Sequence, residues 1–293
     1  MSIRVLADTM KISAPAKINL FLQVLGRRDD GYHELRTLMV CIGLHDTLVL
    51  RMGTSRNAII CSHPDVPADE TNLALKAALA YNRALADKTS LIPLNLSIEL
   101  IKRIPVGAGL GGGSSDAAAV LNGLNRYYNN PLSDEKLHAL ALSLGADVPF
   151  FVHGQPAIAT GVGEHLESYT GLSPWGVVVV YPGFGLSTAE VFKNLNLRLT
   201  KCEKQLRYFP FKNGKFCALH HLCNDLEPGV TARFPVIQEL KKVLLDHGAL
   251  GALMTGSGSA VFGLFADPQA AQDVRRALAC RDEWQIFVTE LLC

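Results

Sequence analysis

The alternation of apolar and polar positions along the chain predicts both strands and helices. Residues 94–101 (LNLSIELI) alternate between apolar and polar side chains, which is typical of a half-buried strand. Residues 72–86 place Ala and Leu at helical spacing and favour a helix. Residues 12–25 have extended character, because Pro15 excludes a helix through their start. Further strands are predicted over residues 35–42, 46–51 and 175–181, a strand, glycine turn and strand over 250–265, and helices over 133–144, 237–246 and 268–279.

The predicted strands and helices follow one another without a regular strand–helix–strand rhythm. This order favours an α+β fold over a doubly wound parallel sheet. A length of 293 residues allows two domains. Glycines cluster near residues 160–175, and a long uncharged stretch begins at residue 168. We therefore predict an N-terminal domain over residues 1–165 and a C-terminal domain over residues 166–293.

The composition is that of a globular protein without a strong electrostatic field. Hydrophobic residues make up 48% of the chain and charged residues 19%, which excludes a disordered chain. The 28 Lys and Arg residues nearly balance 27 Asp and Glu residues, and this excludes a broad basic surface for nucleic acid. The N-terminus has no hydrophobic run, and Pro, Gly, Ser and Thr interrupt both long uncharged stretches. We expect a cytoplasmic protein that binds neither nucleic acid nor membranes.

The seven cysteines form no Cys-x-x-Cys pair, and their number is odd. In a chain of this size the pattern predicts reduced thiols in a reducing compartment and no disulfide framework. Cys217, His220, His221 and Cys223 gather four potential soft metal ligands in one short segment. No second Cys or His pair lies at zinc-site spacing, and a helix would spread these side chains around its circumference. We expect helix packing here, and no residue of the chain is assigned as a metal ligand.

A glycine-rich segment runs into an alanine-rich helix at residues 105–116 (PVGAGLGGGSSD). Its five glycines cost conformational entropy in an ordered loop, so a structural reason is expected. Without Cβ atoms the backbone can turn its N–H groups into one concavity, and the helix adds free N–H groups and its positive end. We predict a phosphate site; the alternative is a flexible turn before a capped helix. The residues of the predicted site are Pro105, Val106, Gly107, Ala108, Gly109, Leu110, Gly111, Gly112, Gly113, Ser114 and Ser115.

Other phosphate-binding patterns fit this segment less well. Gly107, Gly109 and Gly112 satisfy the G-x-G-x-x-G fingerprint of dinucleotide-binding folds. However, residues 102–106 separate the predicted strand from the first glycine, and no acidic residue ends a strand about 20 residues further on. The Walker pattern fails because its Lys is missing, and the HRD and DFG tripeptides of protein kinases are absent.

Residues 105–116 resemble the ATP loop of the superfamily of galactokinase, homoserine kinase, mevalonate kinase and phosphomevalonate kinase. The resemblance implies a two-domain α+β fold in which residues 1–165 bind ATP and carry the catalytic groups. Residues 166–293 would bind the substrate, with the active site in the cleft between the domains. Further segments agree with the resemblance: residues 15–20 (PAKINL), 31–35 (GYHEL), 144–151 (LGADVPFF), 224–228 (NDLEP) and 255–260 (TGSGSA).

Three of these segments, GYHEL, LGADVPFF and NDLEP, resemble one branch of the superfamily. Its members transfer the γ-phosphoryl group of ATP to a cytidine-diphosphate-linked branched tetritol in isoprenoid precursor synthesis. Lys17 and Asp147 match the catalytic pair of this branch. The pKa of an Asp side chain lies far below that of an alcohol, so Asp147 is expected to orient the hydroxyl group and accept its proton late. Lys17 is expected to keep Asp147 ionised and to offset phosphoryl charge; a solvated Lys and a turn Asp are the alternatives.

The same resemblance implies a set of substrate contacts. Tyr32 and Phe192 match stacking aromatic residues, and His33 matches the residue that reads the edge of the cytosine. Stacking on a base contributes about 1–3 kcal/mol in single-stranded nucleic-acid sites. Asn19 and Thr188 match further substrate contacts. From the residues alone, Tyr32 and Phe192 are more often core residues, and that alternative stays open.

For ATP, Asn72 and Lys102 match positions that line the nucleotide pocket of the family. A capping Asn and a solvated charged turn at Lys102 and Arg103 are the alternatives. Asp116 lies in the first turns of the helix, where an acid suits the helix dipole but repels a phosphate unless a cation bridges the two. Magnesium is therefore implied as a cofactor carried by ATP, held mainly by phosphates and water.

Two rival functions stay open at this point. Another kinase of the superfamily, of the mevalonate or homoserine type, is disfavoured by Tyr32 and His33, because those substrates carry no cytosine. A non-catalytic nucleotide-binding protein of the same fold would be expected to have lost Lys17 or Asp147, and both are present. We expect a small-molecule substrate as the partner, and a monomer or weak homodimer.

Overall fold

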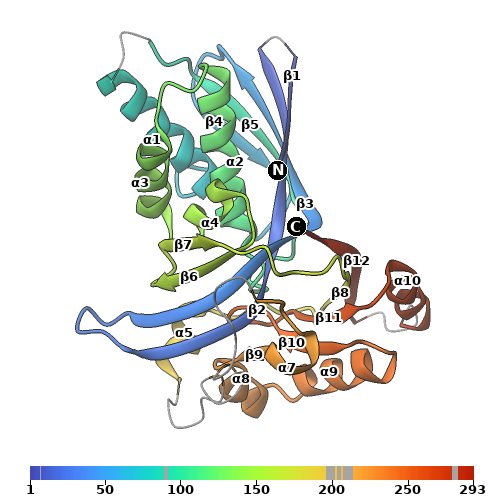
Figure 1. Cartoon of the computed structure of the whole chain (residues 1–293). Helices are drawn as coiled ribbons and strands as arrows, with labels where there is room; N and C mark the ends of the chain where they lie inside the picture. The colour runs from blue at the N-terminus through green and yellow to red at the C-terminus, as the bar shows by residue number, and fades with distance from the viewer. Residues whose placement is uncertain (7, 89–91, 196–201, 203–205, 207–213, 279–282) are drawn as a thin grey trace. The chain divides into compact units, whose positions relative to one another are not determined.

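The computed structural model describes residues 1–6, 8–88, 92–195, 202, 206, 214–278 and 283–293 (Figure 1). The chain forms two compact units. The first unit comprises residues 1–16, 45–106 and 111–154, and the second comprises residues 17–44, 107–110 and 155–293.

Two long strands, β2 (Thr9–Arg27) and β3 (His33–Met52), continue from one unit into the other. For this reason the compact units differ from the predicted division after residue 165, which assumed one uninterrupted segment for each domain. The separate roles of residues 1–165 and 166–293 stay predictions.

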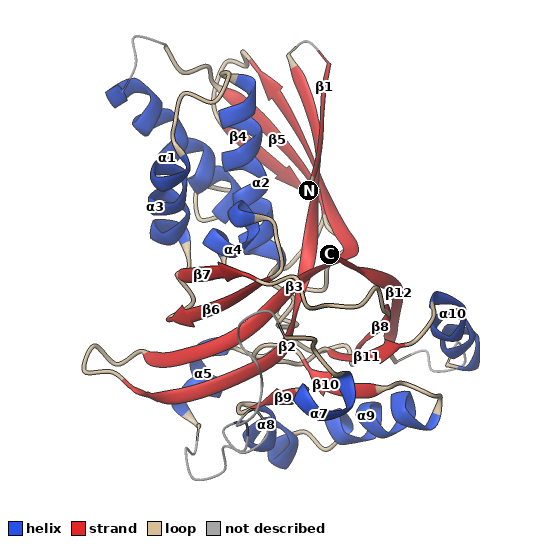
Figure 2. Ribbon diagram, viewed as in Figure 1, coloured by secondary structure: helices blue, strands red, loops and turns tan. Residues whose placement is uncertain are grey.

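The first unit combines strands with four helices that lie on one side of them (Figure 2). Strand β1 pairs antiparallel with β2, with Ser2 opposite Ser13. Strand β5 pairs antiparallel with β3 and parallel with β4. Its other elements are β1 (Ser2–Leu6), β4 (Ala58–Cys61), α1 (Leu73–Lys88), β5 (Leu96–Ile101), α2 (Gly112–Tyr127), α3 (Asp134–Leu144) and α4 (Val148–His153).

Helices α1 and α2 pack closely because their facing positions carry small side chains. Ala77 and Ala78 of α1 are fully buried, as are Ala117 and Ala118 of α2. The helices expected over residues 72–86 and 133–144 and the strand expected over 94–101 are confirmed, with ends shifted by at most two residues.

The second unit is built on antiparallel strands in the order β12, β8, β11, β10, covered by helices α9 and α10. Strand β3 pairs with β12 and with β6, which pairs with β7, and β2 pairs parallel with β9. The elements are β6 (Ala157–Gly161), β7 (His165–Ser168), β8 (Gly176–Tyr181), α5 (Thr188–Lys193), α7 (Ala218–His221), β9 (Cys223–Asn224), α8 (Glu227–Arg233), α9 (Val236–Asp246), β10 (Gly251–Met254), β11 (Val261–Phe265), α10 (Pro268–Ala277) and β12 (Gln285–Leu292).

The α+β class is confirmed, but one local prediction is wrong. The two strands expected over residues 35–42 and 46–51 are parts of the single strand β3. The residues left out of both predicted strands, Gly43, Leu44 and His45, are extended as well, and the buried Asp46 that follows them accepts backbone N–H groups. In the part of the chain that the structure describes, none of the helices has both the length and the apolar character required to span a bilayer.

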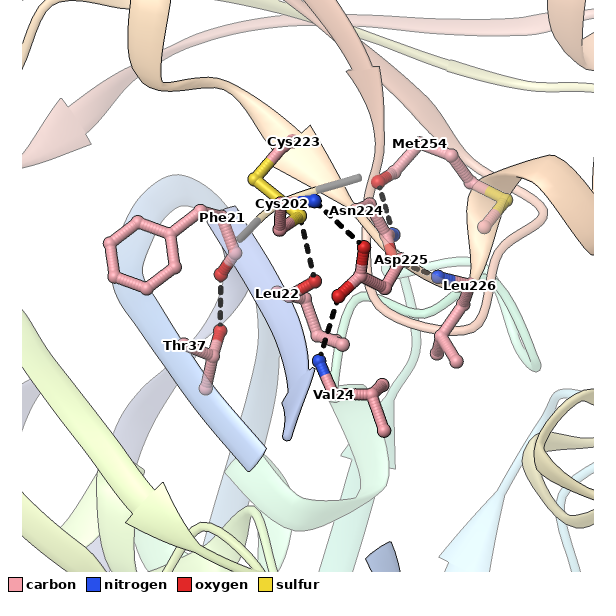
Figure 3. The surroundings of a disulfide bond; sticks show 10 residues. All are labelled: Phe21, Leu22, Val24, Thr37, Cys202, Cys223, Asn224, Asp225, Leu226 and Met254. Carbon is pink, nitrogen blue, oxygen red and sulfur yellow. Dashed lines mark hydrogen bonds between the residues drawn. A yellow bond between two sulfur atoms is a disulfide. The ribbon is translucent and has the colours of Figure 1, made fainter. Parts of the chain in front are cut away.

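A disulfide bond joins Cys202 to Cys223 in the second unit (Figure 3), so the expectation of reduced thiols is wrong for this pair. The two Cα atoms lie 5.6 Å apart, within the usual range for a disulfide. No spacing pattern indicated the bond, because strand β9 brings Cys223 to β2 only in the folded chain. The Cys223 sulfur is therefore not available as a soft metal ligand, while His221 Nδ1 accepts the N–H of Cys217. Cys280 lies outside the described residues.

Candidate functional site

The glycine-rich loop is ordered by its own backbone conformation and by backbone hydrogen bonds. Gly107, Gly109 and Gly111 have φ angles of +67°, +75° and +70°, a region that side chains with a Cβ disfavour. The carbonyl of Gly107 accepts the N–H of Leu186, and the carbonyl of Ala108 accepts that of Ala260, both in the second unit. These contacts favour a fixed loop over a flexible turn.

The end of the loop leaves the start of helix α2 accessible. Gly111 is the N-cap residue of α2, and the helix begins at Gly112. Gly113 is exposed, and a Cβ at this position would meet only Leu73 Cδ1, at 3.7 Å. The first N–H groups of a helix lack partners within the helix, so a phosphate site at this position stays a prediction that the exposed Gly113 is compatible with.

Gly109 of the loop is required for packing against the late glycine turn (residues 255–258), and not for the close approach of a ligand. A Cβ on Gly109 would clash with the carbonyl oxygen of Thr255 and lie 3.0 Å from the N atom of Gly258. Conversely, a Cβ on Gly256 in the late turn would lie 2.9 Å from the carbonyl oxygen of Gly109. The early glycine loop and the late glycine turn at residues 255–258 therefore pack backbone against backbone, and the second unit requires glycine on both sides.

Lys17 is held in one position by a chain of hydrogen bonds. Its backbone N–H donates to the carbonyl of Leu110 at 3.0 Å, and its Nζ donates to Asn19 Oδ1 at 2.7 Å. Asn19 Nδ2 donates to the Thr37 hydroxyl at 2.8 Å, which donates in turn to the carbonyl of Phe21 at 2.6 Å (Figure 3). Lys17 is 4% exposed, so the alternative of a solvated surface lysine is wrong.

Asp147 lies directly before helix α4 in the first unit. It is half-buried with φ −83°, and its side chain does not cap the helix. Pro149 at the start of α4 fixes the backbone just after it. Lys17 belongs to the second unit. The surroundings of Lys17 and Asp147, the predicted catalytic pair, are therefore given for each residue within its own unit.

The predicted substrate residues all belong to the second unit, and two of them, Thr188 and Phe192, lie on helix α5. The rings of His33 and Phe192 stack with centroids 5.2 Å apart and an angle of 30° between their planes. Burial, and then the charge of Arg27, lower the pKa of His33 below its usual value, which favours the neutral imidazole with one donor and one acceptor nitrogen. Tyr32 is 65% exposed, so it is not a core residue.

The late glycine turn connects α5 to the Lys17 hydrogen-bond chain. The hydroxyl groups of Thr188, the first residue of α5, and Ser257 lie 2.9 Å apart. Within the same turn, the Thr255 hydroxyl accepts the backbone N–H of Asn19 at 3.1 Å. Thr188, Asn19 and Lys17 are therefore brought together through Thr255 and Ser257, two residues to which the sequence analysis assigned no role.

The two residues expected to line the nucleotide pocket both have structural partners. Asn72 Oδ1 accepts the N–H of Ala74 at 2.9 Å, and its Nδ2 donates to the carbonyl of Pro67. Asn72 therefore caps α1, which was the alternative interpretation. Lys102 is buried against two carboxylates and is not a solvated charge. Contact of either residue with a nucleotide stays a prediction.

Asn224 is a further residue of this region that the sequence analysis did not assign. Its Nδ2 donates to the carbonyls of Met254 and Gly256, both at 2.8 Å, and its Oδ1 accepts the N–H of Leu226 (Figure 3). It is 6% exposed. Asn224 therefore holds the late glycine turn; it stands in the family-like segment NDLEP, which is the only signal in the sequence that marked it.

We expect Asn224→Asp to lower the free energy of unfolding by about 1–3 kcal/mol, because a carboxylate would face two carbonyl oxygens and leave them without a donor. Urea unfolding followed by circular dichroism measures the change. The matched control is Asn130→Asp at an exposed turn, where a change below about 0.5 kcal/mol is expected. Equal stability of the two variants would show that Asn224 does not hold the turn.

The side chains of the described residues do not form a cage for a magnesium ion. Among them, no group of three or more His, Cys, Asp or Glu side chains is arranged to hold a metal. The Asp116 carboxylate, four residues after the start of α2, is bound to Lys102. No catalytic step is therefore assigned to a protein-bound metal.

Two family models match the chain. A model of the GHMP kinases N terminal domain matches residues 72–155, and a model of the GHMP kinases C terminal region matches residues 213–282. The two matches fall on either side of residue 165, the predicted domain boundary.

Curated relatives match almost the whole chain. The 4-diphosphocytidyl-2-C-methyl-D-erythritol kinase of Syntrophotalea carbinolica is 45% identical over 278 residues, which cover 94% of this chain and 97% of the relative. The enzyme of the same name from Desulfotalea psychrophila is 41% identical over 290 residues, which cover 97% and 96%.

Solved structures agree with these matches. A crystal structure of 4-(cytidine 5'-diphospho)-2C-methyl-D-erythritol kinase is similar with a TM-score of 0.78 and 38% identity, covering 96% of this chain and 99% of that one. Homoserine kinase from Cytophaga hutchinsonii has a TM-score of 0.76 at 19% identity, covering 99% and 97%, and shows the shared fold alone. The resemblance drawn from the glycine loop and its companion segments is thereby confirmed.

Proposed function

Because the chain belongs to the 4-diphosphocytidyl-2-C-methyl-D-erythritol kinase family of the GHMP kinases, we propose that it phosphorylates the 2-hydroxyl group of that cytidine diphosphate compound. It is a phosphotransferase with an alcohol group as acceptor and ATP as co-substrate. The observation that carries the choice of substrate is the arrangement in the second unit. There the buried Lys17 is linked, through hydrogen bonds to Asn19 and the late glycine turn, to the helix whose Phe192 stacks on His33.

Lys17 and Asp147 would act on the reacting groups. Asp147 would orient the acceptor hydroxyl group and accept its proton late in a loose transition state. The Lys17 ammonium group, aimed by Asn19, would offset the charge on the transferred phosphoryl group. Asn19 uses both ends of its amide on Lys17 and Thr37, so we assign it a positioning role besides the predicted substrate contact.

His33, Phe192 and the exposed Tyr32 would bind the cytosine. Stacking aromatic rings favour any base, whereas a neutral imidazole can donate to and accept from the edge of one base. Thr188 would contact the substrate from the start of α5, supported by Ser257.

The glycine loop and the first turn of α2 would bind the ATP phosphates through backbone N–H groups. Magnesium would enter with ATP and neutralise part of the phosphate charge, held by phosphates and water. The charge of Lys102 is committed to Asp46 and Asp116, so the backbone and not this side chain would carry most of the phosphate contact.

One assay tests the substrate assignment. ADP release is measured with 4-diphosphocytidyl-2-C-methyl-D-erythritol, mevalonate and homoserine at equal concentrations. We expect release only with the first, because only this substrate has a base for the aromatic residues to bind. Faster release with mevalonate or homoserine would overturn the assignment, and release with none of the three would indicate a binding protein.

We expect Tyr32→Ala to raise KM for the cytidine substrate about tenfold or more, because loss of one stack costs about 1–3 kcal/mol. KM for ATP should stay within roughly a factor of two. Steady-state kinetics with each substrate varied in turn measures both values. The control is Tyr127→Ala at the C-terminal end of α2, where neither KM should change. An equal rise of both KM values in Tyr32→Ala would exclude a specific role in base binding.

A further inference from the structure

A buried cluster of three charged side chains lies near the start of helix α2 in the first unit. Lys102 Nζ donates to Asp46 Oδ2, and it donates to Asp116 Oδ2 at 2.9 Å. The side chains of Lys102, Asp46 and Asp116 are only 5%, 0% and 3% exposed. None of the roles proposed above uses Asp46 or the Asp116 carboxyl group.

The cluster carries two carboxyl groups but one ammonium group. Burial alone lowers the pKa of Lys102, but the charges of Asp116 and Asp46 outweigh burial and raise it, so the ammonium form is retained. With both carboxyl groups ionised, the buried cluster has a net charge of −1, which is unfavourable away from water.

The two carboxyl groups are not equally compensated. Asp46 Oδ1 accepts the backbone N–H groups of Arg103 at 2.5 Å and Ile104 at 2.9 Å, besides the Lys102 bond at its other oxygen. Asp116 Oδ2 accepts from Lys102, and among the described residues the buried Asp116 Oδ1 has no hydrogen-bond partner. Asp116 is therefore the member that can most readily become neutral.

The charges around Asp116 lead to the same assignment. The pKa of Asp116 is raised to about 7, because burial and the nearby Asp46 carboxyl group raise it by more than Lys102 lowers it. Helices α1, α3 and α4 also pack against α2 or its neighbours. Tyr81 on α1 is fully buried and its hydroxyl group donates to Asn125 Oδ1 at 3.1 Å, whereas the other charged and titratable side chains that the structure describes on these helices are exposed or half-buried, outside this cluster. These side chains are Lys76, Arg83 and Asp87 on α1, Asp134, Glu135, Lys136 and His138 on α3, and Asp147 and His153 at the ends of α4.

The start of α2 is also the place where the proposed function puts the phosphates of ATP, and the next step rests on that proposal. Asp116 follows the first residue of α2 by four positions, which corresponds to about 6 Å along the helix axis. At this distance phosphate charges repel a buried carboxylate, and salt screens the repulsion little.

We propose that ATP binds to α2 together with one proton, which the Asp116 carboxylate takes up from solvent. The carboxylate and the proton form the neutral acid, and Lys102 stays paired with Asp46. When the nucleotide leaves, the acid returns the proton to solvent. Because the bound state holds the proton more tightly than the free state, ATP affinity falls as the pH rises above 7, by at most about tenfold for each pH unit.

Isothermal titration calorimetry of the full-length protein with ATP and Mg²⁺ tests the proposal. Titrations at pH 7.5 in phosphate and in Tris, two buffers with different ionisation enthalpies, give the number of protons taken up. We expect uptake of about three quarters of a proton per ATP in the wild type, since a free carboxyl group with a pKa of about 7 is only about one quarter protonated at this pH. Asp116→Asn should bind ATP with that uptake lost. Asp134→Asn, which removes an exposed acid from the first turn of α3, should keep it.

Several outcomes would overturn the proposal. Absence of uptake in the wild type would show that the repulsion is neutralised in another way, for example by Mg²⁺. Uptake that persists in a folded Asp116→Asn variant would place the proton on another group, ATP included. If circular dichroism shows that Asp116→Asn is unfolded, titration of the wild type at pH 6 replaces it. At pH 6 the Asp116 carboxyl group is already protonated and takes up almost no proton, so proton uptake that persists at this pH excludes Asp116. Absence of ATP binding in the wild type would overturn the ATP site itself, and is distinguished by the lack of saturable heat in either buffer.

Discussion

Asp147→Asn lowers kcat by roughly 10²–10⁴-fold, the range typical of a group that moves a proton in the transition state. The amide keeps the shape of the carboxyl group but cannot accept the proton of the acceptor hydroxyl group. KM for ATP changes by no more than a few-fold, because Asp147 would act on the acceptor and not on the nucleotide. Single-turnover and steady-state kinetics with both substrates measure the two effects.

The control for this variant is Asp87→Asn, an exposed acid at the end of α1 in the same unit, which should keep wild-type kcat. Lys17→Met should also lower kcat. If Lys17 and Asp147 act as a unit, the double variant costs less than the sum of the two single effects. Near-normal turnover in Asp147→Asn would remove this residue from the mechanism.

Gly109→Ala lowers the free energy of unfolding by roughly 2–4 kcal/mol, the combined cost of overpacking and of a left-handed φ. The new Cβ would clash with the carbonyl oxygen of Thr255 and lie 3.0 Å from Gly258 N. Both neighbours are backbone atoms, so no side chain can rotate to make room. Because the glycine loop and the late turn would move apart, KM for both substrates is expected to rise.

Urea unfolding of Gly109→Ala measures the change in stability. Gly229→Ala is the matched control, since a Cβ at this position in helix α8 meets no atom within 4 Å and the φ angle there is not positive. It should be neutral or slightly stabilising. Wild-type stability of Gly109→Ala would show that the two glycine segments do not pack as closely as the backbone indicates.

Elements with a strong local pattern could be predicted from the sequence. Helices α1 and α3 and strands β5 and β8 lie within two residues of the predicted ranges, because side-chain periodicity and capping residues act over a few positions. The glycine loop is local in the same sense, since a positive φ and a missing Cβ are properties of single residues. Strand β3 was divided at residues 43–45 in the prediction, because its continuity depends on pairing with β12 on one side of this gap and with β5 on the other, which is not a local property.

The partners of the site residues could not be predicted in this way. The pattern around Lys17 marks it as part of a family-like segment, but its environment depends on Thr37 and on Thr255, which bonds Asn19 from 236 residues away. The same holds for Lys102, which the resemblance placed in the nucleotide pocket with a solvated turn as the alternative, and which is buried between Asp46 and Asp116.

The sequence by itself therefore determined the class of fold and the glycine loop, because both follow from residue types at short spacing. The superfamily and most of the candidate site residues came from the resemblance of several such segments to a known family. Only the tertiary structure decided which side chains are buried together: the carboxyl pair around Lys102, the disulfide between Cys202 and Cys223, and the hold of Asn224 on the late glycine turn. The physical reason is that a buried polar group takes its partner from whichever segment the packing of the core brings within hydrogen-bond distance.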